Sequence, residues 1–302
     1  MTLLRDGLIK PGATPEIVRD RGSTLLVRGH RGYGQVVAEE GMRLAIERAR
    51  QHGIACVGVY DLLHIGRLAD YVITGAKAGM ASLIFTATGG SAAIVAPFGG
   101  KARRLSTNPF AFAVPSGREF PVVFDMATSV IANGKLRVAK DAAKGVLPGL
   151  IIDKEGNPST NALDVERGGA ILPLGGMDKG YKGYLMGFLV EVLGGLLTGG
   201  GFQGKEIDPL FSNPSFMIAL DVERFRPMGL FKAELDRLIA YLKATPAAPG
   251  MEVLAPGEVE ERNERERRRL GIALPEQTVR NLQAELDRFG IPMRLQSLAL
   301  ES

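Results

Sequence analysis

Apolar residues recur at helical and strand spacings through the first third of the chain. From Gln35 to His52 they return every three or four positions with charged residues between them, which predicts an amphipathic helix. The short apolar run IACVGVYD at 54–61 is typical of a strand buried on both faces. A second helix over 68–80 and a second strand over 81–88 follow. Helices and strands that alternate at this spacing indicate an α/β protein.

The remaining sequence divides into turn-rich segments, short strands and helices. Before residue 35 turns dominate, with STLLVRG at 23–29 as a short strand. Residues 142–160 are predicted to be loop, because glycine and proline punctuate them. Further predicted elements are two short strands around a turn at 107–117 and 120–129, a strand at 215–225, a helix at 231–245, and two charged helices at 258–270 and 275–289.

The stretch GGMDKGYKGYLMGFLVEVLGGLLTG at 175–199 is the longest apolar segment of the chain. Its most apolar part contains Glu191 and is shorter than the roughly 20 residues of a membrane span, so we expect no membrane crossing. The following GGGFQG matches a dinucleotide-binding pattern, but that pattern requires a strand before it, and here a helix precedes it. We therefore predict a glycine turn that leads into a buried helix, which ends in the glycines at Gly199.

Composition narrows the classes of function. The chain has 302 residues, 39 glycines and a formal net charge of +4, and most charged segments carry both signs. A segment such as ERNERERRRLG at 261–271 is typical of a solvated helix face with ion pairs, so we expect no nucleic-acid partner. The single cysteine, Cys56, cannot form an intramolecular disulfide. We expect no signal peptide, since Arg5 and Lys10 interrupt the first residues, and we expect the protein in the cytoplasm.

Histidine, the side chain best suited to proton transfer near neutral pH and to metal binding, is rare in this chain. The only histidines are His30, His52 and His64, without the spacing of a metal site, so no metal cofactor is expected. His64 falls between a predicted strand and helix, where α/β proteins place functional side chains, and imidazole can accept or donate a proton near neutral pH. The alternative is a histidine that only caps the next helix, and position alone leaves both readings open.

Polar residues at predicted strand ends are candidates for ligand contacts. Asp125 follows a valine-rich strand, and Thr107 and Asn108 precede another; such residues hold a ribose or an amide, or simply form turns. Lys179 and Lys182 lie among glycines ahead of a helix, where they would grip a phosphate or only face solvent.

Eight blocks taken together resemble the type 2 malate/L-lactate dehydrogenases, a sulfolactate dehydrogenase-like group that includes ureidoglycolate and diketogulonate dehydrogenases. They cover nearly the whole chain in the family's order, and as a set they are specific. The blocks are LRDGLIKPGATPEIV, GYGQVVAEEGMRLAIERARQHGIACVGV, HIGRLADY, IVAPFGG, TNPFAFAVP, FDMATS, GGMDKGYKGYLMGFLVEVLGGLLTG and PGE.

The resemblance implies a three-layer mixed-sheet α/β fold that is not a Rossmann fold. It also implies a homodimer in which NAD or NADP serves the interconversion of a small 2-hydroxy acid and its 2-oxo acid. Thr107 and Asn108 remain weaker candidates for substrate contacts. By motif, His64 would be the proton acceptor, and the cofactor contacts would come from Ser91, Asp125, Met126, Ala127, Lys179, Gly257 and Glu258.

Three departures from the family pattern lead to further expectations. Members begin earlier, with a DSHGVxR-like motif that supplies a histidine and an arginine, so the alternative is an N-terminally truncated, non-catalytic nucleotide-binding relative. Asp178 stands where the family has a histidine before the lysine, and HIGRLADY lacks the aromatic and small residues that usually follow the family's histidine.

We expect residues 75–205 to form an NAD(P)-binding lobe, and 1–74 with 206–302 to form a substrate and dimerisation lobe.

Overall fold

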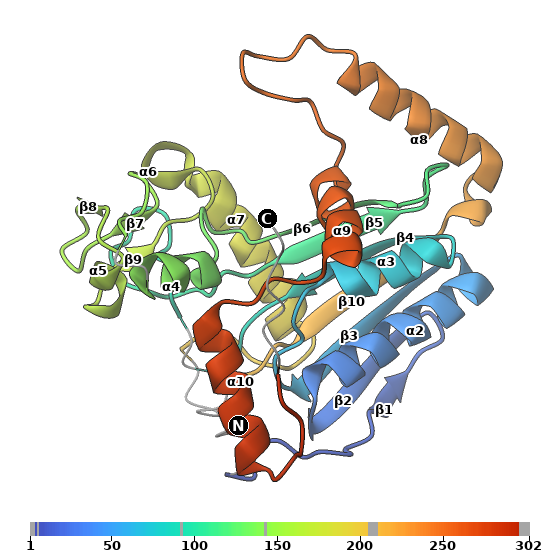
Figure 1. Cartoon of the computed structure of the whole chain (residues 1–302). Coiled ribbons are helices and arrows are strands. Elements are labelled where there is room, and N and C mark those ends of the chain that lie inside the picture. The colour runs from blue at the N-terminus through green and yellow to red at the C-terminus, as the bar shows by residue number, and fades with distance from the viewer. Residues whose placement is uncertain (1–3, 5, 91–92, 142–143, 205–210, 296–302) are drawn as a thin grey trace. The chain divides into compact units, whose positions relative to one another are not determined.

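A seven-stranded mixed sheet organises the larger of the two units into which the chain divides, Met1–Gly257 and Glu258–Ser302 (Figure 1). The computed structural model describes residues 4, 6–90, 93–141, 144–204 and 211–295. The strands of the sheet, in spatial order, are β1 (Glu16–Asp20), β2 (Thr24–Gly32), β3 (Ile54–Leu62), β10 (Ser215–Asp221), β4 (Met80–Thr86), β5 (Phe110–Val114) and β6 (Val122–Met126).

The direction of the strands distinguishes this sheet from the parallel sheet of a Rossmann fold. β2 and β3 run parallel, whereas the other neighbouring pairs of the sheet are antiparallel. β10, which comes last in the sequence, inserts between β3 and β4, with Ile218 opposite Cys56 on one side and Leu83 on the other. The predicted mixed-sheet α/β fold is confirmed.

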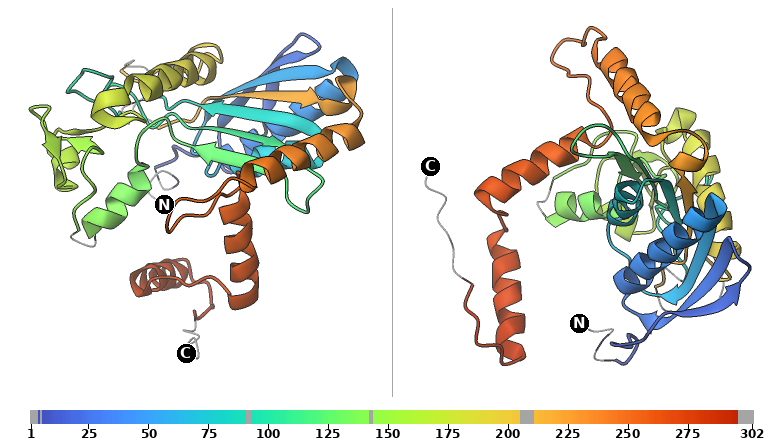
Figure 2. Two further views of the ribbon diagram at one scale, coloured as in Figure 1. Left: turned by 90° about the horizontal axis from the view of Figure 1, so that it is seen from above. Right: turned by 90° about the vertical axis from the view of Figure 1, so that its right-hand side faces the viewer.

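Helices α2 (Gly34–His52) and α3 (Ala69–Lys77) cover one face of the sheet (Figure 2). Their apolar stripes match the predicted periodicity, and residues such as Val37 and Met42 are fully buried. Gly41 lets α2 approach closely, since a Cβ there would lie 2.8 Å from Val59 Cγ1. Burial of this face accounts for the largest apolar core of the protein.

The long apolar segment forms α7 (Tyr181–Val190) and its wider last turns η1 (Glu191–Leu196), which lie on the opposite face of the sheet (Figure 2). Its glycines pack closely on their neighbours: a Cβ on Gly194 would stand 2.8 Å from Ala87 N after β4, and a Cβ on Gly183 would stand 2.3 Å from Leu174 N. Leu185 and Phe188 are 60% and 55% exposed. The expectation of a buried helix is therefore wrong for the large side chains, because glycines occupy the inward face. The predicted ending at Gly199, with φ +76°, is confirmed.

Two strands of a smaller three-stranded sheet lie in the segment 142–160 that was predicted to be loop, and the third strand follows it. The order of this sheet is β8-β7-β9, and its core is built from Ile151, Ile171 and neighbouring apolar side chains. The elements here are α4 (Asn133–Asp141), β7 (Ile151–Ile152), β8 (Pro158–Ser159), α5 (Leu163–Glu166), β9 (Ala170–Ile171) and α6 (Gly176–Lys179). The strands have only two residues each, too few for any periodicity to be read from sequence.

Helices dominate the rest of the chain. After β10 come η2 (Val222–Arg224) and α8 (Met228–Lys243), where Asp236 accepts a hydrogen bond from the backbone N–H of Gly117, 3.3 Å away. The second unit contains α9 (Glu258–Leu270) and α10 (Glu276–Arg288). Along α9 the expected ion pairs form, among them Arg265 with Glu261 at 2.8 Å.

Strands from both predicted lobes share the seven-stranded sheet, and the compact units divide after Gly257. The division into a cofactor lobe and a substrate lobe stays a prediction. Among the described residues, no helix has the length and apolar character that a membrane crossing requires.

Candidate active site

Strand direction brings the polar residues of several loops to one edge of the main sheet. Ser215, the first residue of β10, pairs with Val59 near the end of β3 and with Thr86 at the end of β4. Phe110, the first residue of β5, pairs with Met126 at the end of β6. The residues that follow β3 and β4, end β6 and precede β5 and β10 therefore meet at this edge, and those with functional side chains are His64, Thr88, Asn108, Asp125 and Asn213.

His64 is held by Asn213, a residue that the sequence analysis missed. Its Nδ1 lies 2.8 Å from Asn213 Oδ1, and its ring packs edge-on against Phe211. Asn213 Nδ2 lies 3.3 Å from the carbonyl oxygen of Ala87 and 3.2 Å from that of Ser212. Because those carbonyls can only accept, the amide oxygen must face His64, and His64 Nδ1 must donate. The other ring nitrogen, Nε2, then carries the lone pair of the neutral imidazole.

The loop that carries His64 is fixed at further points. Tyr71, in α3, donates from its hydroxyl to the carbonyl oxygen of Ile65, and burial raises the pKa of Tyr71 to about 12, so the phenol keeps its proton. Asp125 accepts from the backbone N–H of Ala69, 3.0 Å away, at the start of α3. Gly34 packs beneath the loop, where a Cβ would stand 2.5 Å from the carbonyl oxygen of His64.

A buried polar network continues from Asn213 under the sheet edge. Asn213 Nδ2 also approaches Thr88 Oγ1 at 3.4 Å, and the carbonyl oxygen of Thr88 accepts from Gln203 Nε2 at 2.6 Å. Gln203 N in turn donates to Glu191 Oε1 at 3.0 Å, and Asn108 Nδ2 donates to Glu191 Oε2 at 2.6 Å. Glu191 is 7% exposed, and this desolvation raises the pKa of its carboxyl group, although both donors oppose the rise.

The predicted substrate residues differ in accessibility. Asn108 is fully buried, and its amide nitrogen is committed to Glu191 and to the carbonyl oxygen of Gly187 at 2.9 Å. Its backbone has a φ of +37°, which asparagine tolerates better than most residues. Thr107 is half-buried, and its carbonyl oxygen accepts from the hydroxyl of Thr128 at 3.1 Å. A substrate contact by Asn108 would require this network to open.

The predicted cofactor residues cluster in part around β6. Asp125 is exposed at its end, and Met126 and Ala127 are half-buried. Lys179 is exposed at the end of α6. Leu174, just before this helix, is held near the end of β6 because its N–H donates to the carbonyl oxygen of Thr128.

Two other predicted cofactor residues lie at the boundary between the units, and one falls outside the description. Gly257 packs against Val123 near the start of β6, with a φ of +88° and a Cβ position 2.7 Å from Val123 Cγ1. Glu258 begins α9 and pairs with Arg262 at 2.7 Å. Ser91 lies outside the described residues.

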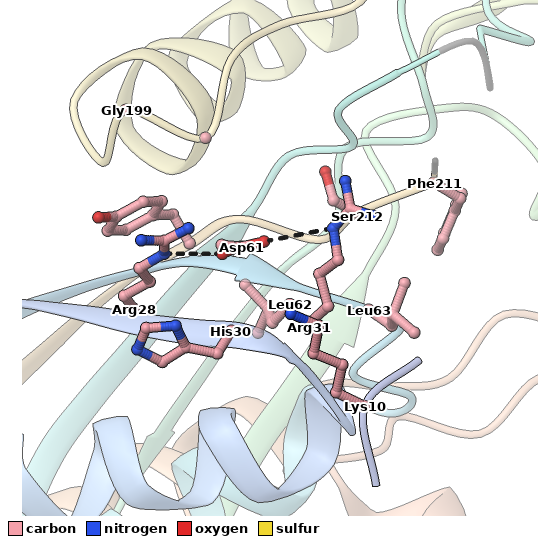
Figure 3. A pocket seen from close by; sticks show the side chains of 12 residues that line it. Lys10, Arg28, His30, Arg31, Asp61, Leu62, Leu63, Gly199, Phe211 and Ser212 are labelled. Carbon is pink, nitrogen blue, oxygen red and sulfur yellow. Dashed lines mark hydrogen bonds and ion pairs between the residues drawn. The ribbon is translucent and has the colours of Figure 1, made fainter. Parts of the chain in front are cut away.

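A cavity of about 350 Å³ opens beside the His64 loop (Figure 3). Arg28 Nε lies 2.8 Å from Asp61 Oδ2, and Arg31 Nε lies 4.0 Å from Asp61 Oδ1, so the two guanidinium groups approach one carboxylate. Leu63 and Phe211, beside His64, belong to its wall. Local sequence patterns do not reveal this charge cluster, because Arg28 and Arg31 belong to β2 and Asp61 to β3, and only the pairing of the two strands brings them together.

Asn213 had a recognisable signal in the sequence. It precedes Pro214 directly before a strand, as Asn108 precedes Pro109 directly before β5. An Asn-Pro pair at a strand start marks a turn whose polar side chain lies at the sheet edge. Within the described residues, no group of His, Cys, Asp and Glu has the arrangement of a metal site.

Known proteins resemble this chain along nearly all of its length. Residues 1–283 match the family model described as malate/L-lactate dehydrogenase. A malate/(S)-sulfolactate dehydrogenase of Methanothermus fervidus is 35% identical over 292 residues, which are 95% of this chain and 82% of that relative. An L-lactate dehydrogenase of Cupriavidus necator is 39% identical over 277 residues, 87% of this chain and 76% of the relative.

The structure has close relatives as well. The crystal structure of a malate dehydrogenase from Entamoeba histolytica superposes with a TM-score of 0.92 at 29% identity, covering 97% of this chain and 84% of that one. The three proteins all bear names of dehydrogenases, and none is named as a non-catalytic nucleotide-binding protein.

Proposed function

The chain belongs to the malate/L-lactate dehydrogenase family, and we propose that His64 moves the proton in an NAD- or NADP-dependent interconversion of a 2-hydroxy acid and its 2-oxo acid. The family and its named relatives make the chain a 2-hydroxy acid oxidoreductase. The observation that carries the role of His64 is its hydrogen bond to Asn213, which leaves Nε2 as the nitrogen able to accept a proton.

The chemistry divides between a hydride and a proton. A nicotinamide, when bound, would supply the hydride chemistry at C2 of the acid. His64 Nε2 takes the hydroxyl proton when the hydroxy acid is oxidised and gives it back when the oxo acid is reduced. Asn213 Oδ1 accepts from His64 Nδ1 in both protonation states, so the ring keeps one orientation through the cycle.

The residues around the end of β6 fit a nucleotide. Asp125 is an exposed residue near a strand end, and its carboxylate, which also accepts from the backbone N–H of Ala69, suits the hydroxyls of a ribose. Lys179 offers an exposed cation after the turn at Gly175, where a Cβ would stand 2.5 Å from the carbonyl oxygen of Lys179. We propose that Asp125, Met126, Ala127 and Lys179 hold the cofactor, together with residues from the two predicted segments at Ser91 and at 257–258.

The proposed enzyme acts as a homodimer in the cytoplasm. Exposed apolar side chains along α7 and η1, such as Leu185, Phe188 and Leu196, support a homodimer, since exposed apolar patches of this kind mark interfaces. The substrate is a small acid, and the expected place of the reaction is the cytoplasm. Residues 75–205 would then form the cofactor lobe, with the two chain ends forming the substrate lobe.

The test is substrate reduction by purified protein with His64 intact and replaced. With NADH or NADPH and a panel of 2-oxo acids, the wild type should consume the reduced cofactor, followed at its near-ultraviolet absorbance. His64→Gln should lower kcat by roughly 10²- to 10⁴-fold, the usual share of a positioned proton-transfer group, with an unchanged circular dichroism spectrum. His52→Gln, an exposed histidine in the last turn of α2, is the matched control.

Two results would count against the proposal. A wild type that binds the reduced cofactor but consumes it with none of the acids would remove the reaction. A His64→Gln enzyme with kcat within about threefold of the wild type would leave the reaction standing but assign the proton to another group.

A further inference from the structure

The segment that carries His64 links β3 to α3 without regular secondary structure of its own. Three side chains anchor it along its length. Asn213 holds the His64 ring, and Tyr71 holds the middle of the segment through a backbone carbonyl. Asp125 holds its end, because it accepts a hydrogen bond from the backbone N–H of Ala69, 3.0 Å away. The position of the His64 ring therefore depends on all three anchors.

Only one of these anchors is open to a ligand. Asn213 and Tyr71 are 5% and 7% exposed, so they lie in the interior. Asp125 is exposed, near the end of β6. A carboxylate has two oxygens with about four lone-pair sites, so Asp125 can keep its bond with Ala69 while it accepts another from a ribose hydroxyl. A bound nucleotide can therefore strengthen this anchor and no other.

Strand alternation explains why Asp125 reaches the start of α3. Val123 and Asp125 lie two positions apart on β6, so their side chains share one face of the sheet. Val123 is buried in the core of that face, where α3 packs over β4, β5 and β6 (Figure 1). The first N–H groups of a helix have no partner within it, and the N-cap residue Leu68 has an apolar side chain that cannot accept. Asp125 supplies this cap from another strand, so a shift of its carboxylate moves the end of the His64 segment.

We infer that Asp125 is a positioning residue that couples the nucleotide to His64. A ribose hydroxyl fixes the carboxylate, the carboxylate fixes the start of α3, and the segment then holds His64 in place for the acid. The inference rests on the proposed function, which assigns Asp125 to the cofactor and His64 to the acid. The acid should therefore bind more tightly when the nucleotide is bound, and by reciprocity the nucleotide more tightly when the acid is bound.

ADP-ribose distinguishes this coupling from direct contact between the two ligands. It contains both riboses of the cofactor but lacks the nicotinamide that would touch the acid, and 2′-phospho-ADP-ribose replaces it if the wild type uses NADP. The experiment is a calorimetric titration with L-lactate or L-malate, whichever the wild type oxidises, with and without saturating ADP-ribose. We expect ADP-ribose to lower the Kd of the acid at least about fivefold, the lower end of typical coupling between sites.

Two substitutions of Asp125 and one control test its part in the coupling. Asp125→Ala removes the acceptor of the Ala69 N–H, and ADP-ribose should then change the Kd of the acid by less than about twofold. Asp125→Asn keeps an amide oxygen for this N–H, so it should retain the coupling although ADP-ribose binds more weakly. The control is Asp221→Ala: Asp221 ends β10 opposite Met80, at the other edge of the sheet, and caps η2 by accepting from Glu223 N at 3.2 Å. This variant should lower Tm but leave the coupling unchanged.

Hydrogen exchange measures the same coupling without an acid. The N–H of Ala69 is protected by Asp125, so ADP-ribose should slow its exchange in the wild type at least about fivefold and should have no such effect in Asp125→Ala. The measurement on the wild type decides the matter by itself if Asp125→Ala does not bind ADP-ribose. Unchanged exchange in a wild type saturated with ADP-ribose would overturn the inference.

Further results would overturn the coupling and leave the proposed reaction intact. These are an active wild type that does not bind ADP-ribose, an acid Kd that is equal with and without it, and full coupling in Asp125→Ala. Loss of coupling in Asp221→Ala to the same extent as in Asp125→Ala would assign the effect to general loosening and also overturn the role of Asp125. A wild type that oxidises neither L-lactate nor L-malate and reduces no 2-oxo acid would instead count against the proposed function.

Discussion

Replacement of Asn213 by leucine tests the arrangement on which the proton-transfer role of His64 depends. The side chain is 5% exposed, and its amide bridges His64 Nδ1 at 2.8 Å and the carbonyl oxygens of Ala87 and Ser212. Leucine has a similar size but neither donor nor acceptor. His64 then loses the acceptor that fixes its tautomer, while the buried carbonyl of Ala87 and the N–H of Ile65 lose a partner each.

The unsatisfied backbone groups lower stability, and the lost partner of His64 lowers activity, so the two effects are measured separately. Each buried backbone group left unsatisfied costs about 1–3 kcal/mol, so the free energy of unfolding should fall by roughly 2–5 kcal/mol, within the roughly 5–15 kcal/mol of an ordinary domain. Loss of a partner that orients a functional histidine typically costs about 10- to 100-fold in activity. We therefore expect Asn213→Leu to remain folded at moderate temperature, with a lower Tm, and to lose about 10- to 100-fold in kcat.

Kinetics, thermal melts and nitrogen NMR together measure these effects. With only three histidines in the chain, the ring nitrogens of His64 can be assigned by comparison with His64→Gln. In the neutral wild-type ring the proton should reside on Nδ1, and in Asn213→Leu the two tautomers should mix. Asn281→Leu, at an exposed asparagine of α10, serves as the control. A wild-type His64 protonated on Nε2 in its neutral form, or a kcat in Asn213→Leu within twofold of the wild type, would refute the reasoning.

Two further substitutions probe the packing and the charge around this site. Gly34→Ala would place a Cβ 2.2 Å from the carbonyl oxygen of Leu63 and 2.5 Å from that of His64. Thermal melts should show that the free energy of unfolding falls by about 1–3 kcal/mol, and activity assays should show a lower kcat. The control is Gly134→Ala, whose Cβ would have nothing within 4 Å and should change neither quantity. Burial raises the pKa of the Glu191 carboxyl group in the folded protein. As pH rises, the unfolded chain therefore loses the Glu191 proton before the folded protein does, and the free energy of unfolding falls from about pH 4 upward. Glu191→Gln keeps an oxygen for Asn108 and cannot ionise, so its Tm relative to the wild type should increase between pH 4 and pH 7; a constant difference would contradict this account.

Much of the fold could be predicted from local patterns. Helix α2, strands β3 and β4 and the charged helix α9 all lie within a residue or two of their predicted ranges, because each has a strong periodicity or a clear end signal. The two-residue strands β7, β8 and β9 were missed, since strands this short leave no periodicity in the sequence even though β7 and β8 are near neighbours in the chain.

The helix α7 shows a different limit of sequence reasoning. Its apolar run indicated burial, but glycines take the closely packed inward face, and large apolar side chains such as Leu185 and Phe188 are exposed. Glycine permits close approach of two backbones, and only the structure shows which backbone is approached.

The sequence by itself determined the family, the α/β class and the candidate role of His64, because motifs and periodicities are local or additive properties of the chain. The tertiary structure decided which partners complete the site. Asn213 lies 149 positions from His64, and Arg28 lies 33 positions from Asp61. A hydrogen bond and an ion pair depend on distances of a few ångströms, and pairing of β10 between β3 and β4, with β2 alongside β3, brings these residues together.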